Sequence, residues 1–237
     1  MKKLIESFLL ALFPRRCAYC GKTIPSDSFS CSECEKSLPR IENNICVKCG
    51  REKEECSCKK AERYFSAIAA PFYFEDNVRR GLHAFKFRNG RQNFEAYADE
   101  MAKTVRRRYS GIKFDYVISV PMTEKSRKKR GFDQCALLAE KLSELIGVEY
   151  YPDALKKIYD TDIQHDLIYV LRKGNLAGAF DVSEPEKISG KTFLLCDDIS
   201  TSSETLNECA KMLWLYGAEA TCCVTVAVTK KEKIILH

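Results

Sequence analysis

The chain lacks any run of about 18 consecutive apolar residues, the length that a membrane-spanning helix requires. The apolar stretch at residues 1–13 (MKKLIESFLLALF) is shorter than this and is interrupted by Glu6. No small-residue cleavage site follows it, so we expect neither a signal peptide nor a transmembrane segment. Its apolar residues mark one face of a helix, which we expect to pack on the rest of the chain or on a partner. We therefore expect a soluble, cytoplasmic protein.

Histidine is also scarce, with three residues in a chain of 237. His83 stands alone among the apolar residues of a predicted helix. An isolated histidine in such a pattern is more simply a partly buried side chain than a catalyst, so the sequence does not favour histidine-based catalysis.

Cysteine, in contrast, is abundant, and eight of the 13 cysteines fall between residues 17 and 58. Paired thiolates at short spacing place four sulfurs around a tetrahedral Zn²⁺ ion. Two such sites use all eight residues, and we expect two structural zinc ions that supply folding energy to this small segment. The simplest grouping is sequential, with interleaved grouping as the alternative: Cys17, Cys20, Cys31 and Cys34, then Cys46, Cys49, Cys56 and Cys58. A disulfide framework would need an oxidising compartment, which we do not expect here.

Charge is unevenly distributed along the chain, whose net charge is +6. Residues 79–130 hold 15 Lys or Arg against five Asp or Glu, so this window is strongly basic and the remainder is slightly acidic. A basic stripe suits a polyphosphate ligand or a nucleic-acid backbone. The alternative is a set of solvated basic faces without a partner.

Downstream of the cysteines, apolar segments typical of buried strands alternate with amphipathic segments typical of helices. This alternation predicts an α/β fold with a mostly parallel sheet and helices on both faces. The predicted strands lie in 64–75, 114–120, 148–151, 192–196 and 220–228, and the predicted helices in 77–87, 94–109, 132–146 and 206–216. Residues 122–130 are predicted as a basic loop and 155–180 as a flexible flap. Ligands bind beyond the carboxyl ends of parallel strands, so the loops after Val120 and Cys196 should face one crevice.

The clearest chemical signal lies at residues 193–205, which read FLLCDDISTSSET. An apolar strand, a loop of small hydroxyl residues and a helix start make a phosphate cradle, because the first N–H groups of a helix lack partners and the helix dipole favours an anion. Asp197 and Asp198 beside the cradle suit sugar hydroxyls or a Mg²⁺ ion carried by the ligand. Together they predict a site for a phosphorylated sugar. The alternative is an ordinary strand–turn–helix with an acidic N-cap.

This segment resembles the 5-phosphoribosyl-1-pyrophosphate (PRPP) motif of type I phosphoribosyltransferases, in which two acids and two apolar residues precede Thr-Thr-Gly-x-Thr. The positions that fit are Asp197, Asp198, Ile199, Ser200, Thr201 and Thr205. Ser202 replaces a threonine and keeps its hydroxyl. Ser203 replaces the glycine, which permits a positive φ or close approach to phosphate. Either the loop bends differently here or PRPP binding is weakened.

Further motifs make the whole chain resemble the ComF/GntX family, which joins a double zinc ribbon to a phosphoribosyltransferase-like domain. The matching motifs are Val120-Pro121 with the basic run and residues 130–134 (RGFDQ), Lys86-Phe87, Arg172, Asn175, Ala179-Phe180 and the lead-in at 13–17 (FPRRC). Asp133 stands where the family has asparagine. The resemblance implies a type I phosphoribosyltransferase-like fold, with an N-terminal helix and double zinc ribbon at 1–61 and the second domain at 62–237.

The resemblance also implies roles for individual residues. Asp197 and Asp198 would be the catalytic carboxylates that contact the ribose, and the 5′-phosphate would lie against Thr201, Ser202, Ser203, Glu204 and Thr205. The Mg²⁺-bound pyrophosphate would lie against Lys129 and Arg130. The carboxylates would stabilise a cationic, oxocarbenium-like transition state, and residues 156–175 would close over the site.

Three functions remain open from the sequence. The first is a PRPP-binding protein of the competence family that acts with DNA in natural transformation, with single-stranded DNA and other competence proteins as partners. The second is an active phosphoribosyltransferase on an unknown small acceptor, because no base-recognition pocket is identified. The third is a non-enzymatic adaptor in which the zinc ribbons bind partners and the PRPP pocket is vestigial.

Overall fold

The computed structural model describes residues 14–42, 44–56, 58, 62–87, 90–158 and 179–230. Its centre is a six-stranded sheet in the order β1-β8-β7-β3-β4, with β2 also paired to β8. Every pairing in this sheet is parallel. The strands are β1 (Ala67–Ala69), β2 (Phe72–Tyr73), β3 (Tyr116–Ser119), β4 (Glu149–Tyr150), β7 (Thr192–Ser200) and β8 (Ala220–Val228). The predicted parallel sheet is confirmed.

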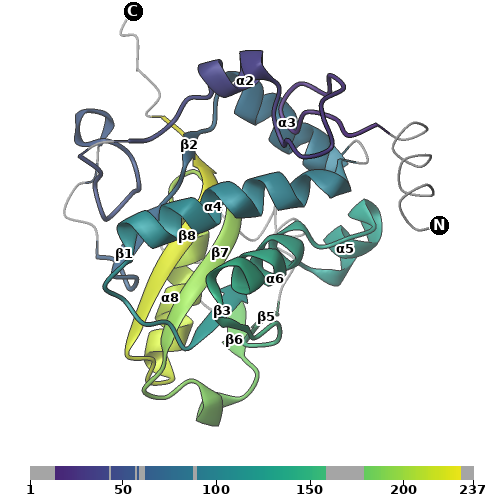
Figure 1. Ribbon diagram of the computed structural model, residues 1–237. Coiled ribbons are helices and arrows are strands. Elements are labelled where there is room, and N and C mark those ends of the chain that lie inside the picture. The colour runs from purple at the N-terminus through teal and green to yellow at the C-terminus, as the bar shows by residue number, and fades with distance from the viewer. Residues whose placement is uncertain are drawn as a thin grey trace, which may run out of the picture.

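Helices cover both faces of the sheet (Figure 1). The helices α3 (Asp76–Phe87), α4 (Phe94–Arg108) and α6 (Gln134–Ile146) lie on one face, and α8 (Glu204–Leu215) lies on the other. The shorter elements are α2 (Ser32–Ser37), α5 (Glu124–Arg130) and the 3-10 helices η1 (Lys53–Glu55), η2 (Arg91–Asn93) and η3 (Pro185–Lys187). The fold is therefore the predicted α/β fold with helices on both faces of a parallel sheet, and it follows a cysteine-rich segment in the chain.

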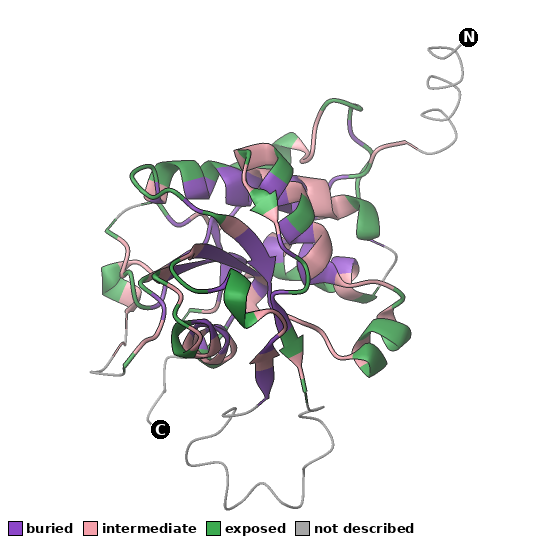
Figure 2. Ribbon diagram, turned by 90° about the horizontal axis from the view of Figure 1, so that it is seen from below, coloured by how far each residue is buried: buried purple, intermediate pink, exposed green. Residues whose placement is uncertain are grey.

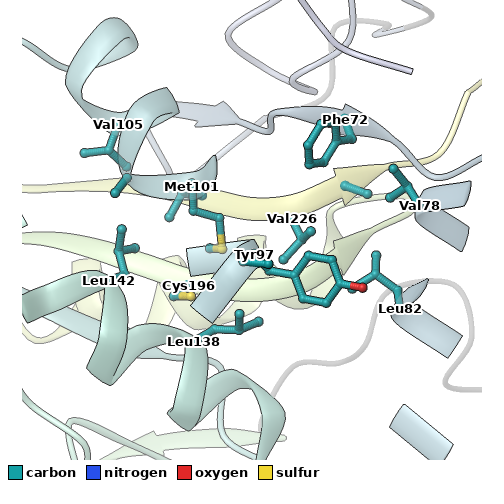
Figure 3. Close-up of a cluster of buried hydrophobic side chains, with 14 of the residues drawn as sticks. Phe72, Val78, Leu82, Tyr97, Met101, Val105, Leu138, Leu142, Cys196 and Val226 are labelled. Carbon is teal, nitrogen blue, oxygen red and sulfur yellow. The ribbon is translucent and has the colours of Figure 1, made fainter. Parts of the chain in front are cut away.

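Most residues of the central strands are apolar because each face of the sheet is covered. Along β7, Leu194 and Cys196 join the cluster under α4 and α6, whereas Phe193 and Leu195 join the cluster under α8. Figure 2 shows the central strands buried between helices that carry both buried and exposed residues. The larger cluster gathers side chains from three helices and the sheet (Figure 3): Leu82, Tyr97, Met101, Leu138, Cys196 and Val226.

The first part of the cysteine-rich segment belongs to this same cluster, since Ala18 and Tyr19 are buried in it. The hydroxyl of Tyr97 donates a hydrogen bond to the carbonyl of Ala18 at 2.9 Å. Gly81 of α3 permits this contact, because a Cβ there would lie 2.5 Å from the Ala18 carbonyl oxygen. The segment is therefore packed onto the sheet domain and shares its core.

Two elements differ from the sequence prediction. Residues 124–130 form the helix α5 and not a loop: Thr123 caps its start by accepting a hydrogen bond from the N–H of Ser126, and Gly131 ends it with φ 80°. The strand expected to end at Cys196 continues to Ser200, because its last residues pair with Thr225, Ala227 and Val228 of β8. Asp197 and Asp198 therefore lie within the strand.

The expected flap is described only at its ends, where β5 (Leu155–Lys157) and β6 (Phe180–Val182) form an antiparallel pair. Arg172 and Asn175 lie outside the described residues, as does the helix predicted at 1–13. Ala179 and Phe180 are buried beside α8. Within the described ranges, no helix is long and apolar enough to cross a membrane.

We predict that Gly81→Ala will lower the free energy of unfolding by about 3 kcal/mol, because the added methyl group overlaps the Ala18 carbonyl and the Tyr97 hydroxyl. The matched control is Gly111→Ala, since a Cβ at Gly111 meets no atom within 4 Å. We expect that control to change stability by less than about 0.5 kcal/mol. Urea denaturation of both variants measures the difference, and equal stabilities would contradict the shared core.

Candidate functional site

The eight N-terminal cysteines form two groups of four in sequential order. In each group the four sulfur atoms lie within 4.8 Å of one another: Cys17, Cys20, Cys31 and Cys34, and then Cys46, Cys49, Cys56 and Cys58. One sulfur pair in each group, Cys20–Cys31 and Cys49–Cys56, is separated by 3.7 Å. That matches the edge of about 3.8 Å of a tetrahedron with Zn–S bonds of about 2.3 Å, and far exceeds a disulfide bond. The sequential grouping is confirmed, and both groups fit structural zinc.

The backbone around Cys17 favours its thiolate, the form that zinc binds, whereas burial raises the pKa values of Cys20 and Cys34. Burial raises the pKa of Cys17, but hydrogen bonds from the backbone N–H groups of Cys31, Tyr19 and Cys20 outweigh it and lower the pKa to about 7. The Cys31 N–H lies 3.4 Å from the Cys17 sulfur. The chain therefore stabilises negative charge on this sulfur.

The two carboxylates lie where β7 extends past the end of β3. The N–H of Val120 donates to the Cys196 carbonyl at 2.9 Å, so the end of β3 is adjacent to the start of the Asp197–Asp198 pair. Asp198 is buried, and its Oδ2 lies 2.7 Å from the Nζ of Lys86. The thiol of Cys135 donates to Oδ1 of Asp197 at 3.2 Å. Residues from α3, α6 and β7 thus meet at the carboxyl edge of the sheet.

The described residues around Asp197 and Asp198 neutralise only part of the negative charge of these two carboxylates. Burial raises the pKa of Asp197, and the charge of Asp198 raises it further, to about 7, although Cys135 and Lys86 oppose the shift. Burial also raises the pKa of the Cys135 thiol, which keeps it protonated as a hydrogen-bond donor. Carboxylate oxygens are the ligands that Mg²⁺ prefers, whereas a protonated thiol is not. The fit to Mg²⁺ therefore rests on Asp197 and Asp198 alone.

Lys86 is the residue of this site that sequence reasoning missed, since it served there only as a family match. Its side chain is 19% exposed, and it lies on the buried face of α3 with Val78 and Leu82. A lysine four residues after a core leucine is the signal that would have found it, because that spacing places it on the apolar face.

The loop between β7 and α8 has the bend that the motif requires. Ser203, which stands in the place of glycine, adopts φ 63° and is buried. Its hydroxyl lies 2.8 Å from that of Ser200. Thr201, Ser202 and Glu204 are exposed and Thr205 is half-buried at the start of α8. The serine is therefore compatible with the positive φ that a glycine supplies.

The basic run is carried on α5 and meets the site at its end. Arg130 donates to Oε1 of Gln134 at 3.0 Å, and its guanidinium lies 5.5 Å from the ring centre of Phe87. The two partners of Arg130 are thus the chain neighbours of Lys86 and Cys135, which contact the carboxylate pair. Lys129 is exposed on the same helix.

Asp133, which stands where the family has asparagine, caps the start of α6. Its carboxylate accepts a hydrogen bond from the N–H of Ala136 at 3.0 Å and caps α6. It also lies 3.6 Å from the guanidinium of Arg127. The negative charge of Asp133 is therefore balanced by contacts at the junction of α5 and α6.

Comparison with known proteins agrees with this arrangement. Residues 8–64 match the model of the double zinc ribbon domain. The chain is 27% identical to the DNA utilization protein YhgH of Escherichia coli, over 86% of each chain. It is 26% identical to competence protein F of Haemophilus influenzae, over 89% of this chain and 96% of that protein, and 24% identical to competence protein ComFC of Bacillus subtilis, over 82% of each.

The resemblance to the ComF family is confirmed. Two solved structures also resemble this chain. The allosteric regulatory enzyme of purine biosynthesis matches with 20% identity and a TM-score of 0.39, covering 56% of this chain and 26% of that one. The purine phosphoribosyltransferase of Pyrococcus horikoshii matches with 16% identity and a TM-score of 0.36, covering 58% and 84%. At these values the similarities say nothing about activity.

We predict that Ser203→Gly will be more stable than Ser203→Ala by about 1 kcal/mol, because both variants lose the hydrogen bond to Ser200 and only glycine relieves the positive φ. At Ser202, whose φ is not positive, the order should reverse, because glycine has more freedom to lose on folding. Urea denaturation of the four variants measures both differences. The same order at both positions would contradict the left-handed conformation of Ser203.

Proposed function

We propose that this ComF-family protein binds PRPP together with Mg²⁺ at the carboxyl ends of β3 and β7. The observation that carries the proposal is the Asp197–Asp198 pair with Lys86, in which Asp198 is buried and Asp197 half-buried, placed directly before a positive-φ serine loop that opens α8. A carboxylate pair that is only partly neutralised by the protein suits a ligand that brings sugar hydroxyls and a cation. The N–H groups at the start of α8 suit its phosphate.

In this proposal each part of PRPP contacts a different group of residues. The 5′-phosphate lies against residues 201–205, the ribose hydroxyls against Asp197 and Asp198, and the pyrophosphate toward Lys129 and Arg130. Mg²⁺, when bound with the ligand, supplies charge neutralisation at the pyrophosphate. Lys86 holds Asp198 in place and adds a positive charge at the floor of the site.

An active phosphoribosyltransferase would use the same site, since two carboxylates stabilise an oxocarbenium-like transition state. We identify no acceptor-selecting residues among those that the structure describes, so the proposed function is PRPP binding and the acceptor stays open. The relatives are named DNA utilization and competence proteins, which supports the proposal that the PRPP-bound protein acts together with DNA.

We predict that replacing both Asp197 and Asp198 with asparagine will abolish PRPP binding, because the ribose and the cation lose their charged partners. Calorimetric titration of PRPP with Mg²⁺ into zinc-loaded protein measures the affinity. The single variant Asp197→Asn keeps the Lys86–Asp198 ion pair, so it tests the same point if the double variant fails to fold. Glu219→Gln, exposed at the opposite end of the sheet, is the control. Unchanged affinity in Asp197→Asn would refute this site.

A second function, binding of single-stranded DNA, is favoured by the surface beside the site. Phe87 is 57% exposed although it is a large apolar residue. The guanidinium of Arg130 and the ring of His83 lie 5.5 Å and 5.0 Å from its ring centre. The exposed cationic residues of α5 directly precede Arg130 in the chain. Exposed aromatic rings among cations suit single strands, since bases stack on the ring and phosphates pair with the cations.

We predict that Phe87→Ala will weaken binding of a thymidine oligonucleotide on the order of tenfold and leave binding of an abasic oligonucleotide of equal length unchanged. Only the first ligand has bases to stack, whereas both have phosphates. Leu215→Ala is the control, because Leu215 is equally exposed and lies on α8, across the sheet. Fluorescence anisotropy at fixed salt measures the affinities. An equal loss for both oligonucleotides would show that Phe87 does not stack on bases.

A further inference from the structure

Arg51 links the second cysteine group to the loop at residues 201–205, which we call the phosphate loop. It lies in the chain between Cys49 and Cys56, two members of that group. Its guanidinium donates to the carbonyl oxygen of Thr201 at 2.8 Å and also to the carbonyl oxygen of Thr229, just after β8. One side chain of the cysteine-rich segment therefore binds both chain segments at the end of the β7–β8 pair.

A second arginine holds the next carbonyl of the loop. The guanidinium of Arg63 donates to the carbonyl oxygen of Ser202 at 3.1 Å. Two consecutive peptide carbonyls of the phosphate loop thus accept hydrogen bonds from charged donors, which are stronger than those from neutral donors.

The position of Arg51 is set by the cysteine group itself. The N–H of Cys46 donates to the Arg51 carbonyl at 2.8 Å, and the N–H of Gly50 donates to the Cys46 carbonyl at 2.8 Å. This turn is also fixed to the sheet, because the N–H of Ile68 in β1 donates to the Val47 carbonyl at 2.9 Å. The turn that places two of the four sulfurs therefore also aims Arg51.

Holding these carbonyls determines where the loop N–H groups point. In a planar trans peptide the carbonyl and the following N–H point in opposite directions. Arg51 on the Thr201 carbonyl therefore turns the Ser202 N–H away from Arg51, and Arg63 on the Ser202 carbonyl turns the Ser203 N–H away from Arg63. Successive N–H groups aimed to one side form an anion-binding concavity.

We propose that the second cysteine group, through Arg51, is a positioning element of the phosphate loop, and that affinity for a sugar phosphomonoester depends on it. This inference rests on the proposed PRPP site and adds that the cysteine-rich segment contributes to it. Zinc in the group Cys46, Cys49, Cys56 and Cys58 would hold the turn that carries Arg51.

The test compares Arg51→Met with the wild type in zinc content, melting temperature and affinity for PRPP and for ribose 5-phosphate. Methionine keeps an apolar stem and removes the donors. We expect unchanged zinc content and roughly tenfold weaker binding of both ligands, because the charged hydrogen bond that orients the loop at Thr201 is lost together with the bond that ties Arg51 to Thr229. Amide hydrogen exchange of residues 201–205 should become faster without ligand, which is a readout independent of binding.

Arg16→Met is the matched control, since the guanidinium of Arg16 donates to the Gly21 carbonyl at 3.2 Å, in the chain between Cys20 and Cys31 of the first cysteine group. It should leave the affinities and the exchange of residues 201–205 unchanged. If Arg51→Met fails to fold, Arg63→Met tests the same step through the Ser202 carbonyl.

The outcomes separate the two proposals. If the wild type binds PRPP, Asp197→Asn weakens binding and the arginine variants bind as the wild type does, the positioning role is overturned and the PRPP site stands. If the wild type binds neither ligand, both proposals fall. Weaker binding with faster loop exchange in Arg51→Met, and not in Arg16→Met, supports both.

Discussion

The pairing of β7 with β8 beyond the end of β3 is the interaction on which the candidate site depends. Ser200 pairs with Val228, and the N–H of Thr229 donates to the Ser200 carbonyl at 3.0 Å. This extension carries the two carboxylates past the neighbouring strand and begins the phosphate loop at a defined point. Because the pairing is buried on both faces, the backbone below the site is held by core packing and not by the loop alone.

The charges gathered on this extension oppose stability. A buried ion pair such as Lys86–Asp198 recovers its desolvation cost only in part. Asp197 forms no ion pair with a described residue, and its pKa is raised from an ordinary value of 3.8 to about 7 by burial and by the charge of Asp198. Between these two values the folded chain retains a proton that the unfolded chain has released, so this group lowers stability as the pH rises. Perturbed carboxylates of this kind gather at functional sites.

The sequence predicted those parts of the molecule that depend on local pattern. Cysteine spacing predicted both metal groups, and apolar periodicity predicted the main strands and helices. The helix at 124–130 was missed because its basic residues suggested a loop, although Thr123 and Gly131 were standard start and stop signals. The strand end was placed too early because carboxylates were taken as a boundary, whereas pairing with β8 overrides that preference.

Contacts between distant segments could not be predicted in this way. Arg51 and Thr201 are 150 positions apart, and no local pattern relates them. The same holds for the contact of the Tyr97 hydroxyl with Ala18 and for the Lys86–Asp198 pair. Such contacts depend on the complete fold, and they decide whether the cysteine-rich segment is an appendage or part of the site.

Ser203 stands where the PRPP motif has glycine, and this difference bears on whether the candidate PRPP pocket is vestigial. A serine at positive φ costs about 1 kcal/mol, and the hydrogen bond between Ser200 and Ser203 offsets a comparable amount. The loop therefore keeps its bend with a local compensation. The carboxylate pair is compensated only in part, because Lys86 pairs with Asp198 and the Cys135 thiol donates to Asp197, while the pKa of Asp197 is still raised to about 7. A pocket that retains the costly charges and compensates the altered loop is better explained by ligand binding than by a scaffold role.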